Sequence, residues 1–482
     1  MNIAFINPTL GGDYSAMDIA ITVLATQVNE LSRHNATIVD LTFHRRNWRR
    51  YLWRELRRAK TNVIGFSLNN LYMQYTREIA QEIKKHTDIP IIVGGHYACC
   101  EPLALFNEPW VDAVATGDAE ESLIGYLDML QRPRESEVDG IWYRCKGRSY
   151  YGSQGQFRHN LDDLPVPDWN LWKDLSKHFY FLGGMLYVIG SRGCPYQCSF
   201  CLAPEIARNV PGHYFRVRDP VAYAQEIGEL WHRHRWQGMK FVQMFDPVFT
   251  IYPDWVERFC DEYKRLGLHK ELPFSVFSRC DHIDEQRVEA LAAANCAILR
   301  VGVESGDDHM RNDIYGKSLG SGEVRQAVEL CHRYGIRLTA FYILGGPGET
   351  HQSIQRTIDL ARELDAARSA FFVFKPFTRK ALQQVLDEGG EVLDEKWAEA
   401  DNITFGVAVK PSPKLGPKQV AWYQRWAYFT TFGKRWLSSM RRLKWRYFWR
   451  LGKYLLRGWA NGLSTSYLMT YGHIYEGDYV WQ

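Results

Sequence analysis

Short β-rich runs alternate with spacers of helix length along most of this 482-residue chain. In the first 130 residues there are five such runs, and most of the spacers between them are long enough to form a helix. These runs are residues 2–8, 35–41, 62–68, 89–95 and 111–117. Strands that alternate with helices form a parallel sheet with helices on both faces. The sequence therefore predicts an α/β fold that begins with a doubly wound parallel sheet.

The alternation resumes after a proline-rich stretch. Pro165 and Pro167, in "LDDLPVPDWNLW" at 161–172, disfavour helix and mark a boundary. An amphipathic helix is predicted over 216–234, behind Pro220. Six further runs have strand character, and they lie within 186–195, 239–250, 273–283, 296–306, 336–350 and 369–378. A second parallel α/β unit is therefore expected.

Three cysteines follow the first of these later strands, in "GCPYQCSFC" at 193–201. Cys194, Cys198 and Cys201 are separated by three and then two residues, and the other seven cysteines are scattered. A closed zinc site needs four ligands in paired spacing, and no matching second pair follows. Three thiolates suit a four-iron cluster whose fourth iron stays open to a substrate or cofactor.

Composition excludes some other classes. A disulfide framework is not expected, because there is no secretory signal, the chain is long enough for a hydrophobic core, and ten cysteines are ordinary for this length. The apolar stretch at 179–190 stops at twelve residues, short of the ~18 that a transmembrane helix needs. With 46% hydrophobic and 24% charged residues, we expect a globular, cytoplasmic protein.

The cysteine spacing, with the aromatic Phe200 before Cys201, resembles the signature of the radical S-adenosylmethionine (SAM) family. The resemblance implies that the three thiolates hold a 4Fe–4S cluster, that SAM binds the open iron, and that the six later strands form a partial (β/α)6 barrel. A chance pattern or an ordinary ferredoxin-type site is the alternative.

The resemblance also assigns residues at the strand ends of this barrel to SAM. Asp246 is expected near the SAM amino group, Ser278 and Arg279 near its carboxylate, and Glu304 and Ser305 near its sulfonium or ribose. The full set is Phe200, Asp246, Ser278, Arg279, Glu304, Ser305, Gly345, Gly346 and Pro347.

Two of these assignments have a simpler alternative. Glu304 could pair with Arg300 or Lys317. The glycines of "LGGPGET" could simply build a turn, instead of letting the backbone approach adenine.

The first domain resembles the cobalamin-binding domain that precedes the radical SAM core in one large subfamily, on the phrases "IIVGGHYA" and "VDAVATGDAEESL". Ligands of such sheets bind at the carboxyl ends of the strands. The implied contacts are Asn7, Thr9, Leu10, Gly11, Ser67, Leu68, Asn69, Leu71, Gly94, Gly95 and Gly117.

One departure concerns the lower axial ligand of the cobalt. Domains that supply a histidine carry DxHxxG after the first strand, whereas this loop reads "NPTLGGDY", and Asp40 and His44 lie at the wrong strand and spacing. We therefore expect cobalamin bound without a histidine. A flavodoxin-like domain that binds no corrinoid is the alternative.

The basic residues of the chain are unevenly distributed. Between Asn402 and Tyr475 there are thirteen Lys or Arg and no acid, which leaves 46 basic and 55 acidic residues elsewhere. Segments 422–459 and 44–60 both interleave aromatic residues with cations. Such helices bind anionic membranes, nucleic acid or acidic substrates, and a cap over the barrel is the alternative. Two of them together favour a membrane surface and a lipid-like or anionic substrate, with no nucleic acid expected.

The sequence thus predicts a cobalamin-dependent radical SAM enzyme that methylates an unactivated carbon and takes electrons from a flavodoxin or ferredoxin. It lies in the cytoplasm, peripherally at the membrane. The alternatives are a cyclase or rearrangement enzyme without methyl transfer, and a membrane- or nucleic-acid-binding scaffold with a structural cluster. The sequence does not fix the substrate or the oligomeric state. The expected domains are a cobalamin-binding-like domain at 1–135, a linker at 136–180, the radical SAM core at 181–385 and a helical C-terminal region at 386–482.

Overall fold

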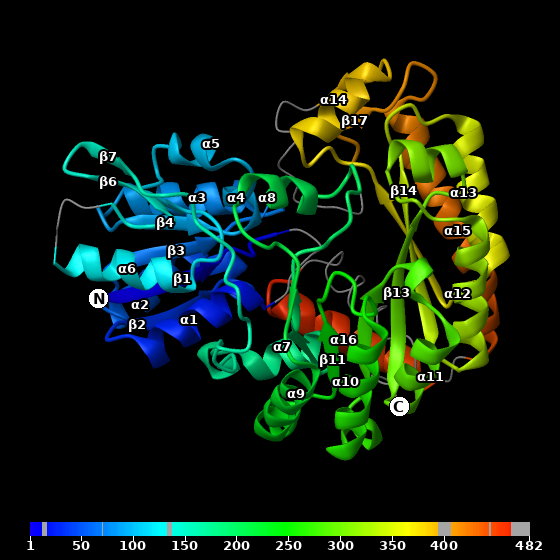
Figure 1. Ribbon diagram of the computed structural model, residues 1–482, viewed down its shortest axis with the longest axis horizontal. Coiled ribbons are helices and arrows are strands. Elements are labelled where there is room, and N and C mark those ends of the chain that lie inside the picture. Colours follow the sequence, from blue (N-terminus) through cyan, green and yellow to red (C-terminus); the bar gives the residue numbers. More distant parts are fainter. Residues whose placement is uncertain (12–16, 70, 133–136, 394–405, 443–444, 464–482) are drawn as a thin grey trace.

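Two sheets, each with its own helices, lie next to each other in this chain (Figure 1). The computed structural model describes residues 1–11, 17–69, 71–132, 137–393, 406–442 and 445–463, and over 432–451 it describes the backbone alone.

The first sheet, which we call the N-terminal sheet, has the strand order β2-β1-β3-β4-β5-β6-β7. The strands from β2 to β5 in this order are parallel, and β6 and β7 extend one edge in the antiparallel sense. All five predicted runs are strands, so the predicted parallel sheet is confirmed. The strands are β1 (Asn2–Asn7), β2 (Asn35–Asp40), β3 (Val63–Ser67), β4 (Ile91–Gly94), β5 (Ala113–Ala115), β6 (Ile141–Cys145) and β7 (Arg148–Tyr151).

Helices cover both faces of the N-terminal sheet. Because successive side chains of a strand point to opposite faces, Phe5 packs in one core with Ile21 and Leu123, from α1 and α6. Its neighbour Ile6 packs in the other core with Leu52, from α2. The helices are α1 (Ile19–Leu31), α2 (Trp48–Arg58, after the 3₁₀ turn η1, Arg45–Asn47), α3 (Met73–Lys84), α4 (His96–Cys100), α5 (Pro102–Phe106) and α6 (Glu120–Gln131).

The hairpin of β6 and β7 is a feature that the alternation of strands and helices does not predict. Lys146 and Gly147 at its tip have φ values of +50° and +76°, as a tight two-residue hairpin turn requires. The rings of Tyr143 and Tyr150 stack across the pair with centroids 4.9 Å apart. Such cross-strand aromatic pairs stabilise a sheet edge.

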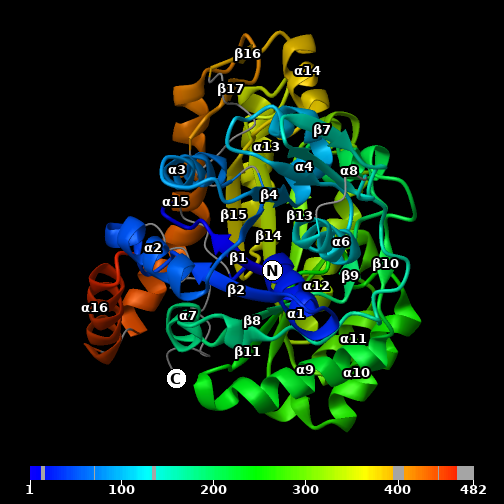
Figure 2. The same cartoon turned by 90° about the vertical axis from the view of Figure 1, so that its left-hand side faces the viewer.

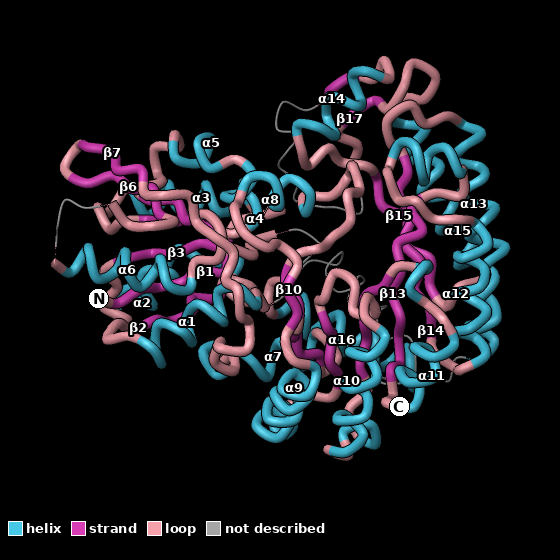
Figure 3. The backbone as a smooth tube through the Cα atoms, viewed as in Figure 1, coloured by secondary structure: helices cyan, strands magenta, loops and turns pink. Residues whose placement is uncertain are grey.

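The second sheet, the barrel sheet, has six strands in the order β15-β14-β13-β12-β11-β8, all parallel (Figure 3). It has the strand order expected of a partial (β/α)6 barrel, with β8 and β15 at its two edges. The strands are β8 (Met185–Val188), β11 (Phe241–Met244), β12 (Phe274–Ser278), β13 (Cys296–Glu304), β14 (Arg337–Leu344) and β15 (Arg368–Val373).

Helices fill the connections of the barrel sheet. The predicted helix behind Pro220 is present as α9, and a short strand pair, β9 (Ser191–Arg192) with β10 (Arg216–Val217), precedes it. The helices are α8 (Ala203–Asn209), α9 (Pro220–His234), α10 (Pro253–Arg265), α11 (Glu285–Ala293), α12 (Ser321–Arg333) and α13 (His351–Leu364). Shorter helical turns are η3 (Arg235–Gln237), η4 (Leu268–Lys270), η5 (Cys280–His282) and the π-helical η6 (Met310–Ile314).

The segment between the two sheets packs on the N-terminal sheet. It contains η2 (Trp169–Leu171) and α7 (Leu175–Phe181). The buried indole of Trp172 donates to the hydroxyl of Thr22 on α1 at 2.9 Å. His178 on α7 lies 2.8 Å from the Asp40 carboxylate at the end of β2, and both side chains are buried. This segment therefore fixes the entry into β8 relative to the first domain.

The described part of the C-terminal region is mainly helical, whereas 394–405, 443–444 and 464–482 of the predicted helical region lie outside the described residues. It contains α14 (Arg379–Asp387), the short strands β16 (Glu391–Val392) and β17 (Val409–Lys410), α15 (Pro417–Arg442) and α16 (Trp445–Ala460). The helix α15 lies along the edge strand β15, where Gln424 donates to the carbonyl of Phe371 at 2.7 Å. Within the described ranges, none of the helices combines the length and apolar character needed to span a bilayer.

Candidate active site

The three predicted cluster ligands lie on one loop between β9 and α8. The loop begins at Gly193, which has φ +82° and whose added Cβ would lie 2.2 Å from the carbonyl oxygen of Tyr214. Only glycine fits there. Further on, the Cys201 N–H donates to the Cys198 carbonyl at 3.1 Å. Cys194, Cys198 and Cys201 are therefore held on one tightly turned segment, which we call the cysteine loop (193–201).

The chain after β13 binds the cysteine loop. The Ser199 N–H donates to the carbonyl of Tyr315 at 3.0 Å, and the Ser199 hydroxyl donates to the carbonyl of Ile314 at 2.7 Å. The ring of Phe200 packs edge-on against Tyr315, with centroids 5.5 Å apart. The loop is thus fixed to the barrel by backbone and ring contacts.

Two buried cations lie beside this loop, and each has a carboxylate partner. The Arg279 guanidinium lies 3.8 Å from the centre of the ring of Tyr196, which is a residue of the cysteine loop. It also donates to Asp281 at 2.9 Å and to the carbonyl of Lys317 at 2.7 Å. The Lys317 ammonium donates to Glu304 at 2.8 Å. The positive charge beside the loop is therefore fixed in place.

These cations act on the cysteine thiols. Burial raises the pKa of Cys194 and Cys198 above the ordinary value, and raises that of Cys201 to about 11. The charge of Lys317 lowers the pKa of all three thiols, and Arg279 lowers that of Cys194 and Cys198. Because iron binds the thiolate, a fixed cation beside the loop favours the ligating form.

Glu304 occupies an unusual backbone position. Its φ is +67°, and the pairing of β13 with β14 shifts register between Gly302 and Glu304. A Cβ on Gly302 would lie 2.0 Å from the Glu304 carboxylate and 2.7 Å from the Lys317 ammonium. Of the two partners that the sequence leaves open, the structure shows Lys317. Burial lowers the pKa of Lys317, but Glu304 and other negative neighbours offset this, so the net pKa is raised and the amine stays charged.

Asp246 lies behind the cysteine loop, at the end of β11, where it binds three groups of the protein. It accepts from the Gly190 N–H at 3.0 Å, the Ser191 hydroxyl at 2.6 Å and the Tyr223 hydroxyl at 3.2 Å. Burial raises its pKa to about 6, against these hydrogen bonds, which favour the charged form. Asp246 therefore positions the chain that enters the cysteine loop.

The "LGGPGET" turn is closed by its own glutamate. The carboxylate of Glu349 accepts from the N–H groups of Gly345 and Gly346. Gly345 has φ +83°, and a Cβ on Gly346 would lie 2.0 Å from the Tyr315 hydroxyl, so both positions need glycine. Burial raises the pKa of Glu349 to about 8. The turn continues through Pro347, and the buried Glu349 side chain holds its backbone in this conformation.

The predicted serines are engaged by protein groups. The Ser278 hydroxyl bonds to Thr250 and donates to the carbonyl of Arg279 at 3.0 Å. The Ser305 hydroxyl lies 3.0 Å from that of Thr357 on α13. Of the predicted SAM residues, Phe200 lies on the cysteine loop itself, and the structure brings Arg279 and Glu304 beside the loop, through their contacts with Tyr196 and Lys317. It places Ser305 against a barrel helix.

The residues predicted to contact cobalamin gather at the carboxyl edge of the N-terminal sheet, because β1, β3, β4 and β5 are parallel and end there. Ser67 pairs with Gly94, and the Leu68 N–H donates to the Gly94 carbonyl at 2.7 Å. The predicted set at this edge is Asn7, Thr9, Leu10, Gly11, Ser67, Leu68, Asn69, Leu71, Gly94, Gly95 and Gly117.

Two polar members of this set bond within the protein. The Asn7 amide donates to Asp40 at 2.9 Å and accepts from the Thr9 hydroxyl at 3.3 Å. The side-chain amide oxygen of Asn69 accepts from the Leu71 N–H at 2.8 Å. These bonds shape the loops after β1 and β3.

The glycines at this edge differ in the room they leave. Gly95 has φ +92°, and its added Cβ would lie 2.7 Å from the Leu68 carbonyl oxygen. A Cβ on Gly117 would lie 2.8 Å from the Gln156 carbonyl oxygen, and one on Gly11 would lie 2.0 Å from the Tyr75 hydroxyl. Gly94, in contrast, would place its Cβ in ordinary contact with Ala115, at 3.5 Å. Of these four glycines, Gly94 is the one whose missing side chain is not replaced by a close protein contact.

The cysteine loop and the carboxyl edge of the N-terminal sheet face each other. The helix α8 begins two residues after Cys201, and α4 begins directly after Gly95. These two helices pack together, and the Asn209 amide on α8 donates to the carbonyls of Cys99 and Cys100 at 3.2 and 3.1 Å. A second contact joins the two regions, since Arg379, the first residue of α14, binds Glu101 after α4 at 2.6 Å.

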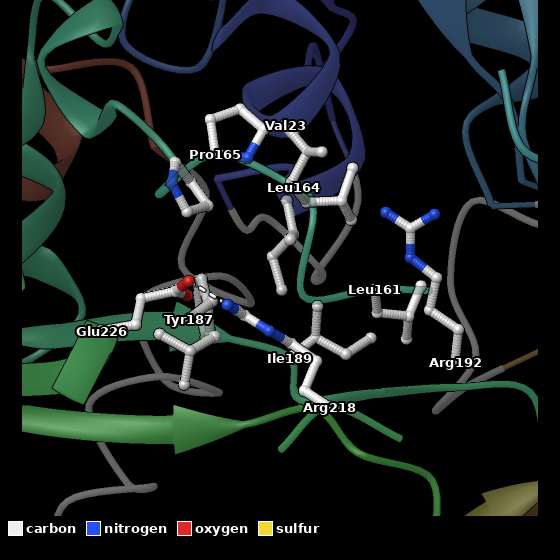
Figure 4. Close-up of a pocket in the computed structure, with 12 residues that line it drawn as sticks. Val23, Leu161, Leu164, Pro165, Tyr187, Ile189, Arg192, Arg218 and Glu226 are labelled. Atoms are coloured by element: carbon white, nitrogen blue, oxygen red, sulfur yellow. Dashed lines mark hydrogen bonds and ion pairs between the residues drawn. The ribbon is translucent and has the colours of Figure 1, made fainter. Parts of the chain in front are cut away.

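A pocket lies where α1, the proline-rich stretch and the end of β8 meet (Figure 4). It has a volume of about 430 Å³, including the part open to solvent, and its lining is mainly apolar, with Val23, Leu161 and Ile189 among the lining residues. Arg218 and Glu226, which form a buried ion pair, also line it. The pocket lies at the junction of the two domains.

Models of two known domain families match the chain. The radical SAM superfamily model matches residues 188–361, and the B12 binding domain model matches residues 9–127. The first match contains the cysteine loop, and the second contains the carboxyl edge of the N-terminal sheet. The chain therefore contains a radical SAM domain and a B12 binding domain.

Several known proteins resemble the chain over about two thirds of its length or more. An uncharacterized methyltransferase of Pyrococcus horikoshii is 24% identical over 398 residues, which cover 80% of this chain and 82% of that protein. The anaerobic magnesium-protoporphyrin IX monomethyl ester cyclase of Rubrivivax gelatinosus is 25% identical over 66% of this chain, which spans 57% of that protein. The solved structure of the radical SAM methyltransferase TsrM of Kitasatospora setae, with tryptophan and a SAM analogue, superimposes with a TM-score of 0.70, at 19% identity and 88% coverage of both chains.

The domains identify the cofactors of this radical SAM protein as a 4Fe–4S cluster, SAM and cobalamin. The residues present fit the cluster, because three thiols lie on one loop and two fixed cations lie beside it. Among the described residues, no three His, Cys, Asp or Glu side chains converge on the position of a single metal ion. A cluster does not require such convergence, because each thiolate binds its own iron. The residues also fit a corrinoid, since Gly94 at the sheet edge carries no side chain where one would fit without a clash.

Sequence reasoning missed several residues of this site. Tyr315 and Tyr196 carry no motif of their own, and their contacts with Phe200 and Arg279 depend on the fold. Glu349 could have been found, since it stands four residues after Gly345, the spacing at which a carboxylate reaches back to close a turn.

Proposed function

We propose that this radical SAM protein methylates an unactivated carbon of a small-molecule or lipid-like substrate. The observation that carries the proposal is the packing of α8, which follows Cys201, on α4, which follows Gly95. When bound, the cluster with SAM supplies a carbon radical, and cobalamin supplies a methyl group. Packing these helices together sets the two cofactor sites opposite each other, so that one substrate carbon can reach both.

In this proposal the residues of the barrel hold and orient the cluster and SAM. Cys194, Cys198 and Cys201 bind the cluster, and Lys317 keeps a positive charge beside it. Glu304, which Lys317 holds in place, is the acid available to a cationic group of SAM. Fixed charges in a buried site stabilise charge without reorganisation when the reaction begins.

The remaining predicted contacts are part of the same proposal. Asp246 fixes the chain that enters the cysteine loop, and the Gly345–Pro347 turn offers its backbone to adenine. At the N-terminal sheet, Gly94 gives the corrinoid tail room to pass. No histidine of the first loop binds the cobalt from below.

Similar proteins support methyl transfer, since two of those described are named methyltransferases. A second candidate is a cyclisation without methyl transfer, favoured by the similarity to a protein named as a cyclase. Both candidates need an electron donor, which we propose to be a flavodoxin or a ferredoxin. We also propose that the protein works in the cytoplasm, peripherally at a membrane surface, where a lipid-like substrate would reside.

The test is a label-transfer experiment with anaerobically reconstituted protein, hydroxocobalamin and SAM that carries a trideuterated methyl group. We expect about one cobalamin per chain, bound without a histidine ligand, and 5′-deoxyadenosine as a product. Incubation with a lipid extract and with a polar metabolite extract should give one compound heavier by the labelled methyl group. If 5′-deoxyadenosine forms with an altered compound that carries no label, the cyclase candidate replaces methyl transfer.

A further inference from the structure

The outer face of α15 carries a row of exposed aromatic rings. Trp422, Trp426 and Phe429 are 56%, 40% and 68% exposed. Their rings stack one on the next, with centroids 5.9 and 5.8 Å apart. The spacing of four and three residues places them on one side of the helix. We call these three residues the aromatic row.

The opposite face of α15 is used by the fold. Val420 and Ala427 are fully buried, and Gln424 donates to the carbonyl of Phe371 on β15. The Tyr428 hydroxyl accepts from the N–H of Phe371 at 3.1 Å. The helix is therefore fixed on the edge of the barrel sheet, and its aromatic row points away from that contact. A role of α15 as a cap on the barrel accounts for the buried residues on its inner face, but it does not account for the exposed aromatic row on its outer face.

Two further elements lie on the same side of the molecule. Figure 2 shows α2, α15 and α16 together at its left edge, although α2 and α16 are almost 400 residues apart in the sequence. The turn η1, which leads directly into α2, contacts α16, since Arg46 donates to the carbonyl of Trp459 at 3.3 Å. On α16, Leu456 and Trp459 are exposed. Apolar side chains therefore reach the surface on both C-terminal helices.

Exposed cations lie on α15 itself and on α2, on the same side of the molecule. Lys418 and Arg425 are exposed on α15, and Arg50, Arg57 and Arg58 are exposed on α2. Within the described part of the chain, none of these five forms an ion pair. Large exposed apolar rings with unpaired cations around them are costly to leave in water and mark a binding surface.

The mixture of side chains distinguishes a lipid surface from a protein partner. The core of a protein interface is depleted in charged residues, lysine in particular. Here Trp422, Arg425 and Trp426 alternate on a single helix. Tryptophan rings and arginine side chains both favour the headgroup region of a bilayer, and cations are attracted by anionic lipids.

We propose that the aromatic row of α15 inserts between the headgroups of an anionic bilayer, while the cations of α2 and α15 bind the lipid phosphates. This inference rests on the proposed membrane association and adds the surface and the mode of binding. It implies that part of the binding energy is apolar and that salt does not screen it.

The test uses the full chain, reconstituted with cluster and cobalamin, in a flotation assay. The vesicles contain phosphatidylglycerol mixed with phosphatidylcholine, or phosphatidylcholine alone. The wild type should float with the anionic vesicles, and a fraction should stay bound at high salt. Changing the row to alanine (Trp422→Ala, Trp426→Ala, Phe429→Ala) should lower vesicle affinity about tenfold or more and abolish the salt-resistant fraction. Trp422→Phe with Trp426→Phe should retain most of the binding.

The matched control removes exposed aromatic side chains elsewhere. Trp236 and Tyr252 are 83% and 49% exposed, and they lie beside α9 and α10. Changing both to alanine should leave vesicle binding unchanged. Iron content and SAM cleavage should be equal in all variants, because none of these residues contacts the cysteine loop.

The outcomes separate this inference from the proposed function. If the wild type floats and the alanine variant floats equally well, the aromatic row is not the contact and the inference is wrong. If the wild type does not float, both the inference and the membrane association are wrong, whereas methyl transfer is untouched. A variant that floats normally but accepts electrons more slowly from an acidic flavodoxin would assign the row to a protein partner instead.

Discussion

The mouth of the barrel and the carboxyl edge of the N-terminal sheet are built in opposite ways. At the barrel, charged side chains are held in place by partners, as Glu304 and Lys317 hold each other. At the N-terminal sheet, the shape of the backbone decides, because Gly94, the last residue of β4, carries no side chain where one could project without a clash. The barrel mouth therefore offers fixed charges to a ligand, and the carboxyl edge of the N-terminal sheet offers space without side chains.

This difference matches the two kinds of cofactor. A cluster and SAM are small and charged, so a site for them gains from fixed charges of defined position. A corrinoid is large and flat, so its site gains from the absence of side chains. Variants that remove charge in one region, or fill room in the other, should therefore fail in different ways.

The largest effect is expected from loss of the ligands. Changing Cys194, Cys198 and Cys201 together to alanine should remove bound iron and all reductive cleavage of SAM, because each thiolate holds one iron. Iron and sulfide analysis with quantification of 5′-deoxyadenosine measures this. Cobalamin binding should survive, since it depends on the other sheet. Loss of corrinoid in this variant would contradict the separation of the two regions.

The next effect concerns the buried ion pair beside the cluster. Lys317→Met leaves Glu304 buried without a partner, which should cost about 3–5 kcal/mol of the free energy of unfolding. Adding Glu304→Gln to this variant should restore part of that loss, because no charge then remains unpaired. Thermal or denaturant unfolding of the two single variants and the double variant measures the coupling. Additive losses would mean that the two side chains do not depend on each other.

Lys317 should also act on the cluster itself. A cation beside the cluster stabilises its more negative, reduced state. Lys317→Met should therefore lower the reduction potential, and Glu304→Gln should raise it, in a redox titration followed by electron paramagnetic resonance without SAM. Lys410→Met, which removes a partly exposed lysine paired with Glu391, is the control and should leave the potential unchanged. Shifts of the same sign in the two site variants would disprove the electrostatic role.

A smaller effect should separate two adjacent glycines. Gly95→Ala forces a side chain into a backbone conformation with φ +92° and against the main chain of Leu68, which should cost about 1–3 kcal/mol. Gly94→Ala meets Ala115 at an ordinary 3.5 Å, so the fold should tolerate it. Gel filtration with hydroxocobalamin should nevertheless show weaker corrinoid binding for Gly94→Ala. Equal corrinoid binding by Gly94→Ala and the wild type would remove this position from the proposed site.

A pH dependence of stability is expected at the "LGGPGET" turn. Because the folded pKa of Glu349, about 8, lies above the ordinary 4.5, the folded protein binds the extra proton between these values. Its stabilising contribution is complete below pH 4.5 and is lost as the pH rises through 8. The glutamine of Glu349→Gln does not titrate. As the pH rises from 4.5 to about 8, the melting temperature of this variant should therefore increase relative to that of the wild type. A constant difference would mean that Glu349 is ionised throughout.

Periodic features of the sequence predicted the fold well. All eleven predicted strand runs contain strands, because alternation of apolar runs with helix-length spacers is a local pattern that needs no distant partner. The sequence did not predict the hairpin at 141–151, because its two antiparallel strands have no helix between them and so depart from the alternation of strands and helices. The domain boundaries and the individual SAM and cobalamin contacts stay predictions.

The sequence by itself determined the chemistry of this protein, since three thiols spaced within eight residues can share a cluster wherever the loop lies. Only the tertiary structure decided which partners the other side chains have. Glu304 with Lys317, Arg279 with Tyr196, and α15 with the edge of β15 depend on contacts between residues that are far apart in the chain or on the path of the chain between them. Such pairings are selected by burial and by the position of each strand in the sheet, and no local pattern in the sequence records them.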